Sequence, residues 1–130
     1  MITILEDEEI ELRTLNENII NTYDIYVKET NECAGYVKYR GYNYDNFLGD
    51  MGAIIYPKYR GHNYTYKAII LISQLLNENG INKYWLTCNK DNIPSKTTIE
   101  KLTDSLPEEI KENVLRYECQ TLEKIKTSKK

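Results

Sequence analysis

The segment YPKYRGHNYTYKAIILISQLL, residues 56–76, joins two different patterns. It starts at the end of a short apolar run, MGAIIY (residues 51–56), which is typical of a buried strand and is stopped by Pro57. From Tyr64 onward, apolar residues recur at the spacing of one helix face. A basic loop that contains Gly61 lies between the two patterns. The segment therefore predicts a strand, a loop and a long helix in succession.

The chemistry of this loop favours an anionic ligand. Free backbone N–H groups and the positive end of the helix dipole make a helix N-terminus an anion site. Gly61 lets the backbone approach a ligand closely, and Asn63 tolerates a left-handed conformation. Lys58 and Arg60 add positive charge. We expect a phosphate or pyrophosphate here, although a solvated basic turn between a strand and a helix would show the same short pattern.

Alternation of apolar and polar residues predicts further strands on both sides of this segment. These predicted strands are residues 9–15, 22–29, 33–40, 83–88 and 113–122. The second and third would form a hairpin through the turn TNE. A second helix is predicted over residues 91–102, with Asp91 or Asn92 as its cap and Pro94 in its first turn. The two strands that flank the long helix would be parallel, because a crossover connects them.

Length and composition limit the class of protein. The 130 residues suit a single domain, 1–130, with residues 124–130 as a flexible tail. A composition of 41% hydrophobic and 28% charged residues is that of an ordinary soluble globular protein. The net charge of -3 argues against a protein that mainly grips nucleic acid, so no nucleic acid partner is expected. The absence of a signal peptide and of a membrane-spanning run predicts a cytoplasmic location without a membrane partner.

Two motifs together carry a resemblance to a known family. The second motif, TCNKDNIPSKTTIEKL (residues 87–102), follows the loop motif after the long helix. In this order they resemble the GNAT superfamily of N-acetyltransferases, and in particular a bacterial branch of predicted acetyltransferases of unassigned substrate. The resemblance extends over roughly residues 22–120. The residues that match the family pattern are Ile55, Pro57, Arg60, Gly61, Tyr64, Cys88, Asn92, Ser95, Glu100, Lys101 and Leu102.

The resemblance implies a fold and a cosubstrate. The implied fold is α+β, with a mixed, central, twisted β-sheet flanked by helices and a shortened N-terminal helical region. The implied cosubstrate is acetyl-coenzyme A, with its pyrophosphate on the backbone of residues 60–66 and its pantetheine arm along residues 54–56, where the parallel strands splay. The cofactor-binding residues implied in this way are Ile54, Ile55, Tyr56, Arg60, Gly61, His62, Asn63, Tyr64, Thr65, Tyr66, Asn92 and Ser95.

The resemblance also implies the reaction, which is transfer of acetyl to an amine of a small molecule or peptide. The oxyanion contact would come from the backbone near residues 54–55, and Asp50 would be the general base. Rival bases are Glu29, Glu32 and Asp45. The family's general-acid tyrosine is replaced here by Ile99, so Tyr117, Tyr84 or water would have to supply that proton. No metal ion is expected, because the acidic start of the chain lacks metal-ligand spacing.

The sequence departs from the family pattern in several places. Asn63 replaces the second glycine of the loop, and the bulkier Thr65 and Tyr66 replace the small residues that usually follow. Residues 103–104 replace a glycine-led turn. The segment NENII, residues 16–20, is the one candidate for a remnant of the N-terminal helices that wall the acceptor site. We therefore expect an acceptor cleft that is open, or one that a second subunit completes in a homodimer.

Two alternatives stay open at this stage. The chain could be a GNAT-fold protein that binds acyl-coenzyme A with little catalysis. It could also be an RNA-binding module, because RGYNYDNF, residues 40–47, overlaps the signature of RNA-recognition motifs at Arg40, Gly41, Tyr42, Tyr44 and Phe47. Against this second alternative, Asp45 takes a position that should face the core, and no amphipathic helix lies between the first strands.

Overall fold

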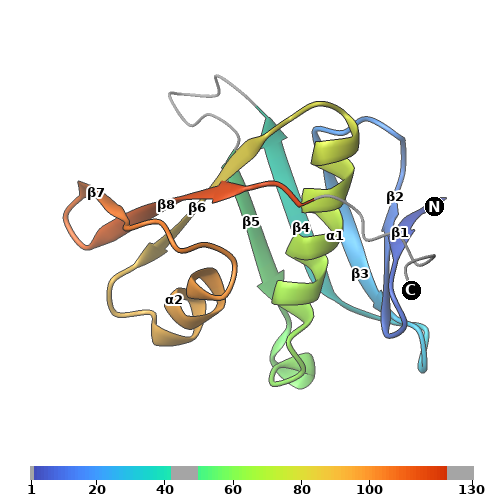
Figure 1. Cartoon of the computed structure of the whole chain (residues 1–130). Helices are drawn as coiled ribbons and strands as arrows, with labels where there is room; N and C mark the ends of the chain where they lie inside the picture. The colour runs from blue at the N-terminus through green and yellow to red at the C-terminus, as the bar shows by residue number, and fades with distance from the viewer. Residues whose placement is uncertain (1, 42–49, 123–130) are drawn as a thin grey trace, which may run out of the picture.

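The computed structural model describes residues 2–41 and 50–122 (Figure 1). They form a mixed eight-stranded sheet in the order β1-β2-β3-β4-β5-β6-β8-β7, with two α-helices and a short 3₁₀ helix. The strands are β1 (Ile2–Glu6), β2 (Ile10–Thr14), β3 (Asn21–Val27), β4 (Glu32–Gly41), β5 (Asp50–Ile55), β6 (Lys83–Asn89), β7 (Glu108–Lys111) and β8 (Val114–Gln120). The helices are η1 (Pro57–Tyr59), α1 (Tyr64–Glu78) and α2 (Ile93–Glu100). The α+β fold with a mixed central sheet is thus as predicted.

The first five strands pair in sequence order, and each pair is antiparallel. Alternation places Leu12, Ile25 and Val37 on one buried face of the sheet. The predicted hairpin of β3 and β4 is confirmed. The predicted helical remnant at residues 16–20 is wrong, because asparagine side chains bond the local backbone instead: Asn16 accepts from the Asn18 N–H at 2.8 Å.

Helix α1 lies across the buried face and contacts β1, β2, β4 and β5 (Figure 1). Its buried residues include Ala68, Leu71 and Ile72, which recur with helical spacing as predicted. The helix is preceded by Asn63 in the left-handed conformation, and Gly80, just beyond its C-cap, also has a positive φ. The helix therefore begins and ends close to where the sequence predicts.

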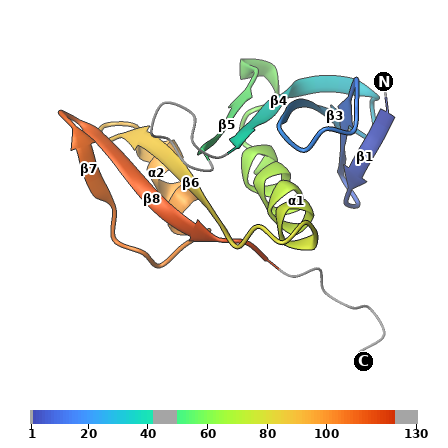
Figure 2. The same cartoon turned by 90° about the horizontal axis from the view of Figure 1, so that it is seen from above.

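The parallel pairing of β5 with β6 is the feature that creates the site. It is confirmed, but it extends over only two residue pairs, Asp50 with Trp85 and Met51 with Leu86. Beyond Met51, β5 stays paired with β4, while β6 pairs along its length with β8. Figure 2 shows the sheet dividing at this point into the half formed by β1–β5 and the half formed by β6, β8 and β7.

Helix α2 begins as the sequence predicts. The Asn92 side chain accepts a hydrogen bond from the Ser95 N–H at 3.2 Å, and Pro94 lies in the first turn. The helix buries Ile99 in the same core as α1 and contacts both β6 and α1. Neither helix of the described part of the chain has the length and hydropathy needed to cross a membrane.

Candidate functional site

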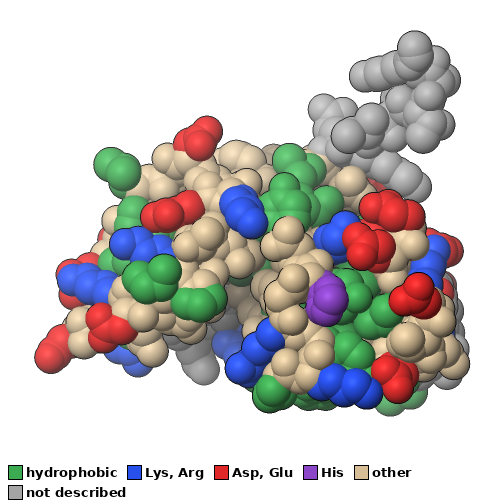
Figure 3. All heavy atoms as spheres, turned by 90° about the horizontal axis from the view of Figure 1, so that it is seen from below, with side chains coloured by type: hydrophobic (Ala, Val, Ile, Leu, Met, Phe, Trp, Pro, Cys, Tyr) green, Lys and Arg blue, Asp and Glu red, His purple; other side chains and the backbone are tan. Residues whose placement is uncertain are grey.

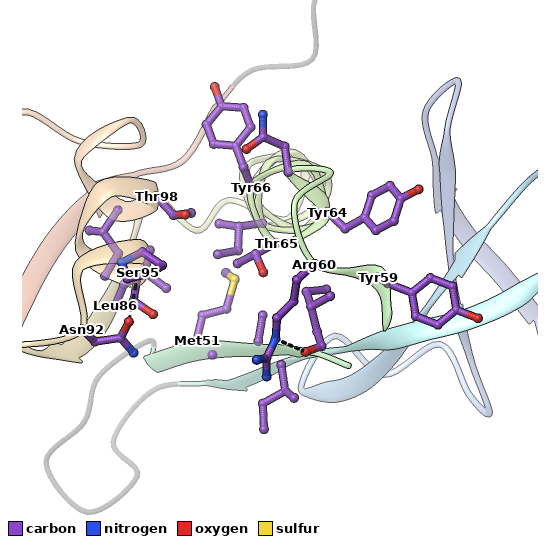
Figure 4. Close-up of a pocket in the computed structure, with 18 of the residues that line it drawn as sticks. Met51, Tyr59, Arg60, Tyr64, Thr65, Tyr66, Leu86, Asn92, Ser95 and Thr98 are labelled. Carbon is purple, nitrogen blue, oxygen red and sulfur yellow. Dashed lines mark hydrogen bonds between the residues drawn. The ribbon is translucent and has the colours of Figure 1, made fainter. Parts of the chain in front are cut away.

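A cleft of about 700 Å³ lies where β5 and β6 separate (Figure 4). Its walls come from β5, the loop after η1, the first turns of α1, β6 and α2. Ten of the residues predicted to bind the cosubstrate line it: Ile54, Ile55, Arg60, Gly61, Asn63, Tyr64, Thr65, Tyr66, Asn92 and Ser95. The structure thus brings the two sequence motifs together around one space.

Two of the predicted cofactor-binding residues, Tyr56 and His62, do not line the cleft. The Tyr56 N–H donates to the Ala34 carbonyl at 2.8 Å, so this group is committed to the pairing with β4. The His62 ring stacks on Tyr64 with centroids 5.2 Å apart. Figure 3 shows this histidine at the surface, with Lys or Arg side chains nearby. A direct side-chain contact with a ligand in the cleft is therefore not expected of either residue.

The loop leaves backbone N–H groups available at the start of α1. Gly61 has a φ of 92° and Asn63 a φ of 63°. Asn63 therefore holds the left-handed conformation that a glycine would adopt at this position, although its side chain makes no capping hydrogen bond. The first hydrogen bond of the helix is donated by the Lys67 N–H to the carbonyl of the cap residue Asn63. The N–H groups of the preceding turn have no intrahelical partner, and no acidic side chain lies in this turn.

The edge of β5 that faces the cleft offers peptide groups. Because Tyr56 bonds to β4, alternation in the antiparallel pair turns the polar groups of Ala53 and Ile55 toward the opposite edge. The Ile55 carbonyl accepts a hydrogen bond from Arg60 Nε at 3.1 Å, which Figure 4 draws as a dashed line. The same figure shows Thr65 pointing into the cleft and Tyr66 pointing away from β5. The bulky side chain of Tyr66 thus leaves the space beside β5 open.

The predicted contribution of Lys58 to the anion site is not supported by its position. Lys58 Nζ lies 3.6 Å from Glu32 Oε1, and Lys58 is absent from the cleft lining. Glu32 also accepts a hydrogen bond from the Tyr59 hydroxyl at 2.7 Å. This bond, followed by the charge of Lys58, lowers the pKa of Glu32. Glu32 therefore anchors the loop and is a poor general base.

The other candidates for proton transfer lie outside the cleft or outside the described residues. Ile99 lines the cleft with 5% exposure, so an apolar side chain faces the space where the family's acid would be expected. Tyr84 and Tyr117 are buried, and burial raises the pKa of each hydroxyl. The side chain of Asp50 is not among those described. Asp45 lies in the segment 42–49, outside the described residues, as do Tyr42, Tyr44 and Phe47 of the RNA-recognition signature.

Sequence reasoning missed about half of the cleft. The unpredicted lining residues are Met51, Gly52, Ala53, Tyr59, Ile69, Leu86, Thr87, Pro94, Thr98 and Ile99. Helical spacing could have indicated some of them, because Thr98 lies one turn after Ser95. The residues of β6 carry no such signal, since their place in the cleft depends on where the two strands part.

The sequence model of a protein family described as acetyltransferase (GNAT) domain matches residues 5–103 of this chain. The chain belongs to the GNAT acetyltransferase family. The resemblance read from the two motifs is therefore confirmed. No curated protein matches this GNAT chain.

Solved GNAT structures share the fold of this chain at low sequence identity. The GNAT-family acetyltransferase from Bacillus anthracis is 13% identical, with a TM-score of 0.70, over 90% of this chain and 98% of that one. RimL, a ribosomal L7/L12 α-N-protein acetyltransferase, is 14% identical in its apo form, with a TM-score of 0.71, over 88% of this chain and 95% of that one. RimL in complex with coenzyme A is 16% identical, with a TM-score of 0.64, over 77% of this chain and 61% of that one. At these identities the likeness establishes the fold of the GNAT chain.

Proposed function

We propose that the protein transfers an acetyl group from acetyl-coenzyme A to an amine of a small molecule or peptide. The observation that carries this proposal is the cleft, where helix N–H groups without an intrahelical partner and an unpaired strand edge lie around one space. The first feature suits a diphosphate, and the second suits the amide groups of a pantetheine arm. The coenzyme A complex of RimL supports the choice of cosubstrate, and its protein N-terminal substrate supports an amine as acceptor.

The residues divide into three roles. The backbone of residues 60–66 would hold the pyrophosphate, with Arg60 adding a positive charge beside it. Ala53 and Ile55 would pair with the pantetheine amides, and Arg60 would then release the Ile55 carbonyl. Asn92 and Ser95, on α2, would lie along the opposite wall.

Bound acetyl-coenzyme A would supply the acetyl group as a thioester: the amine nitrogen bonds to the acyl carbon, the carbon–sulfur bond breaks, and the proton that the amine loses ends on the released thiol. The backbone near residues 54–55 would stabilise the oxyanion. Asp50 remains our proposed base. With Ile99 in the cleft wall, we propose that water returns the proton to the sulfur.

The decisive experiment compares two glycines. Both Gly61 and Gly80 have a positive φ, and a Cβ at either would meet no atom within 4 Å. The substitutions Gly61→Asp and Gly80→Asp therefore each place a side chain with one negative charge at a positive φ, but only Gly61 lines the cleft. We expect acetyl-coenzyme A to raise the melting temperature of the wild type and of Gly80→Asp, with little rise for Gly61→Asp.

Normal binding to Gly61→Asp would show that the pyrophosphate lies elsewhere. Stabilisation by single-stranded RNA, with none by acetyl-coenzyme A, would favour the RNA-binding alternative instead.

A second candidate function is binding of the cosubstrate with little transfer, which the apolar Ile99 favours. Release of free thiol across a panel of amines separates the two functions. An enzyme releases thiol in proportion to the amine, whereas a silent binder is stabilised by acetyl-coenzyme A without amine-dependent release.

A further inference from the structure

A second hollow, of about 470 Å³, lies beside the cleft on β3, β4 and β5. Its lining residues are Thr22, Tyr36, Lys38, Arg40, Gly52, Ala53 and Ile54. Three of these, at positions 52–54, also line the cleft. The two spaces therefore meet at the same three residues of β5.

The hollow lies on the sheet face that the helices leave uncovered. In β4, Val37 and Tyr39 are buried on the helix side, whereas Lys38 between them is exposed. Strand register places Thr22 opposite Lys38, and Lys38 opposite Gly52. These three residues thus form one row across three strands. Gly52 has no side chain, and a Cβ there would meet no atom within 4 Å. The space above the β5 end of this row is therefore empty of protein atoms.

The cleft passes through the sheet to this face. Its lining includes Met51 and Leu86, which are buried on the helix side. It also includes Gly52, Ile54 and Thr87, which alternate with the buried residues and are exposed. A group held in the cleft near the junction of β5 and β6 can therefore be approached from the face that carries the hollow.

The charge of the hollow is positive at Lys38. Its side chain is exposed, and among the described residues no carboxylate pairs with it. Arg40 is a second cationic residue of the lining. Asp24, on the same face, stands opposite the lining residue Tyr36 in the register of β3 with β4. On its other side it stands opposite Arg13, which itself pairs with Glu11. A ligand that occupies the hollow next to Lys38 therefore contacts an ammonium group.

We propose that this hollow holds the amine acceptor and that Lys38 selects acceptors that also carry an anionic group, a carboxylate or a phosphate. The proposal rests on the proposed acetyltransferase function, because it concerns the second substrate of the same site. The amine would reach the thioester through the gap beside Gly52, while the anionic group lies against the Lys38 ammonium. Lys38 is thus a specificity-determining residue.

The test measures thiol release with pairs of amines that differ in one charge. A free amino acid is compared with its carboxamide, and phosphoethanolamine with ethanolamine, so that the two pairs distinguish a carboxylate from a phosphate. For the wild type we expect kcat/KM to favour the anionic member of at least one pair by about fivefold, the size of one partly exposed ion pair. Lys38→Gln should remove this preference through KM, and Lys38→Glu should reverse it. Lys111→Gln, which removes one charge from the edge strand β7, should retain the preference.

The outcomes separate this proposal from the function on which it rests. Binding of acetyl-coenzyme A without release to any amine overturns the proposed function, and the acceptor proposal with it. Equal kcat/KM for both members of each pair in the wild type, or a preference that survives Lys38→Glu, overturns the acceptor proposal and leaves the transferase function in place. Melting temperatures with acetyl-coenzyme A should be the same for wild type and the Lys38 variants, because Lys38 does not line the cleft.

Discussion

Gly35 and Gly52 lie on neighbouring strands and differ sharply in what surrounds them. A Cβ at Gly35 would lie 2.1 Å from the Ile54 carbonyl oxygen and 2.9 Å from the Ile55 Cα. Both are backbone atoms, so neither can move without shifting β5. Gly35 therefore permits the close approach of β4 that holds the cleft wall in place. Gly52, by contrast, borders open space.

We predict that Gly35→Ala strongly destabilises the protein, whereas Gly52→Ala is nearly neutral. The first substitution places a methyl group against a strand backbone, which would cost about 1–3 kcal/mol or more of folding free energy. Urea denaturation of both variants checks the difference. Equal midpoints for the two would mean that β4 and β5 do not approach each other as closely as described.

Helix α2 combines a capped first turn with a single buried apolar residue. Ile99 is its buried residue, and the Asn92 side chain bonds the Ser95 N–H at 3.2 Å. The predicted cap, helix type and Pro94 are confirmed, because capping residues act over a few neighbouring positions. The short edge strands β1 and β7 were not predicted. In β7, three of the four residues are exposed, so alternation between apolar and polar residues gives little signal there.

We predict that Asn92→Ala lowers the free energy of unfolding by about 1 kcal/mol, the usual effect of losing an N-cap. Ser95→Ala is the matched variant, because it keeps the backbone N–H that the cap accepts from. Its stability should stay close to that of the wild type. Chemical denaturation measures both, and an equal loss in the two variants would contradict the capping role of Asn92.

The core of the molecule is rich in tyrosine. The chain has 12 tyrosines and one phenylalanine, and Tyr23, Tyr39, Tyr84 and Tyr117 are among its largest fully buried side chains. Burial raises the pKa of Tyr23 to about 12, and it raises the pKa of Tyr84 further. The folded state thus binds these phenolic protons more tightly than the unfolded state, where the pKa is 10.0.

We predict that this contribution to stability is fully present below pH 10 and is lost as the pH rises toward 12, the pKa of Tyr23 in the folded state. Denaturant midpoints measured across this range, with tyrosinate absorbance as a second signal, check the prediction. Tyr84→Phe removes one of the titrating groups and should make the decline shallower. A wild-type midpoint that does not change through this range would show that the buried hydroxyls ionise without cost.

Local pattern was enough to predict the strands β2 to β6 and β8, both α-helices and the loop that lines one end of the cleft. Strand alternation, helical spacing and turn residues act between positions a few residues apart, so a single sequence carries them. Asn92 was predicted as a helix cap from local pattern, but Asn92 and Ser95 were assigned to the binding site only through the resemblance of the second motif to the family.

Three-dimensional packing decided the rest. Strands β5 and β6 separate because β5 stays paired with β4 while β6 pairs with β8. This separation opens the cleft. The row of Thr22, Lys38 and Gly52 arises from the register of three strands, which joins residues distant in the chain. Such contacts depend on which strands pair and where each pairing stops, and pairing over long separations leaves no local pattern in the sequence.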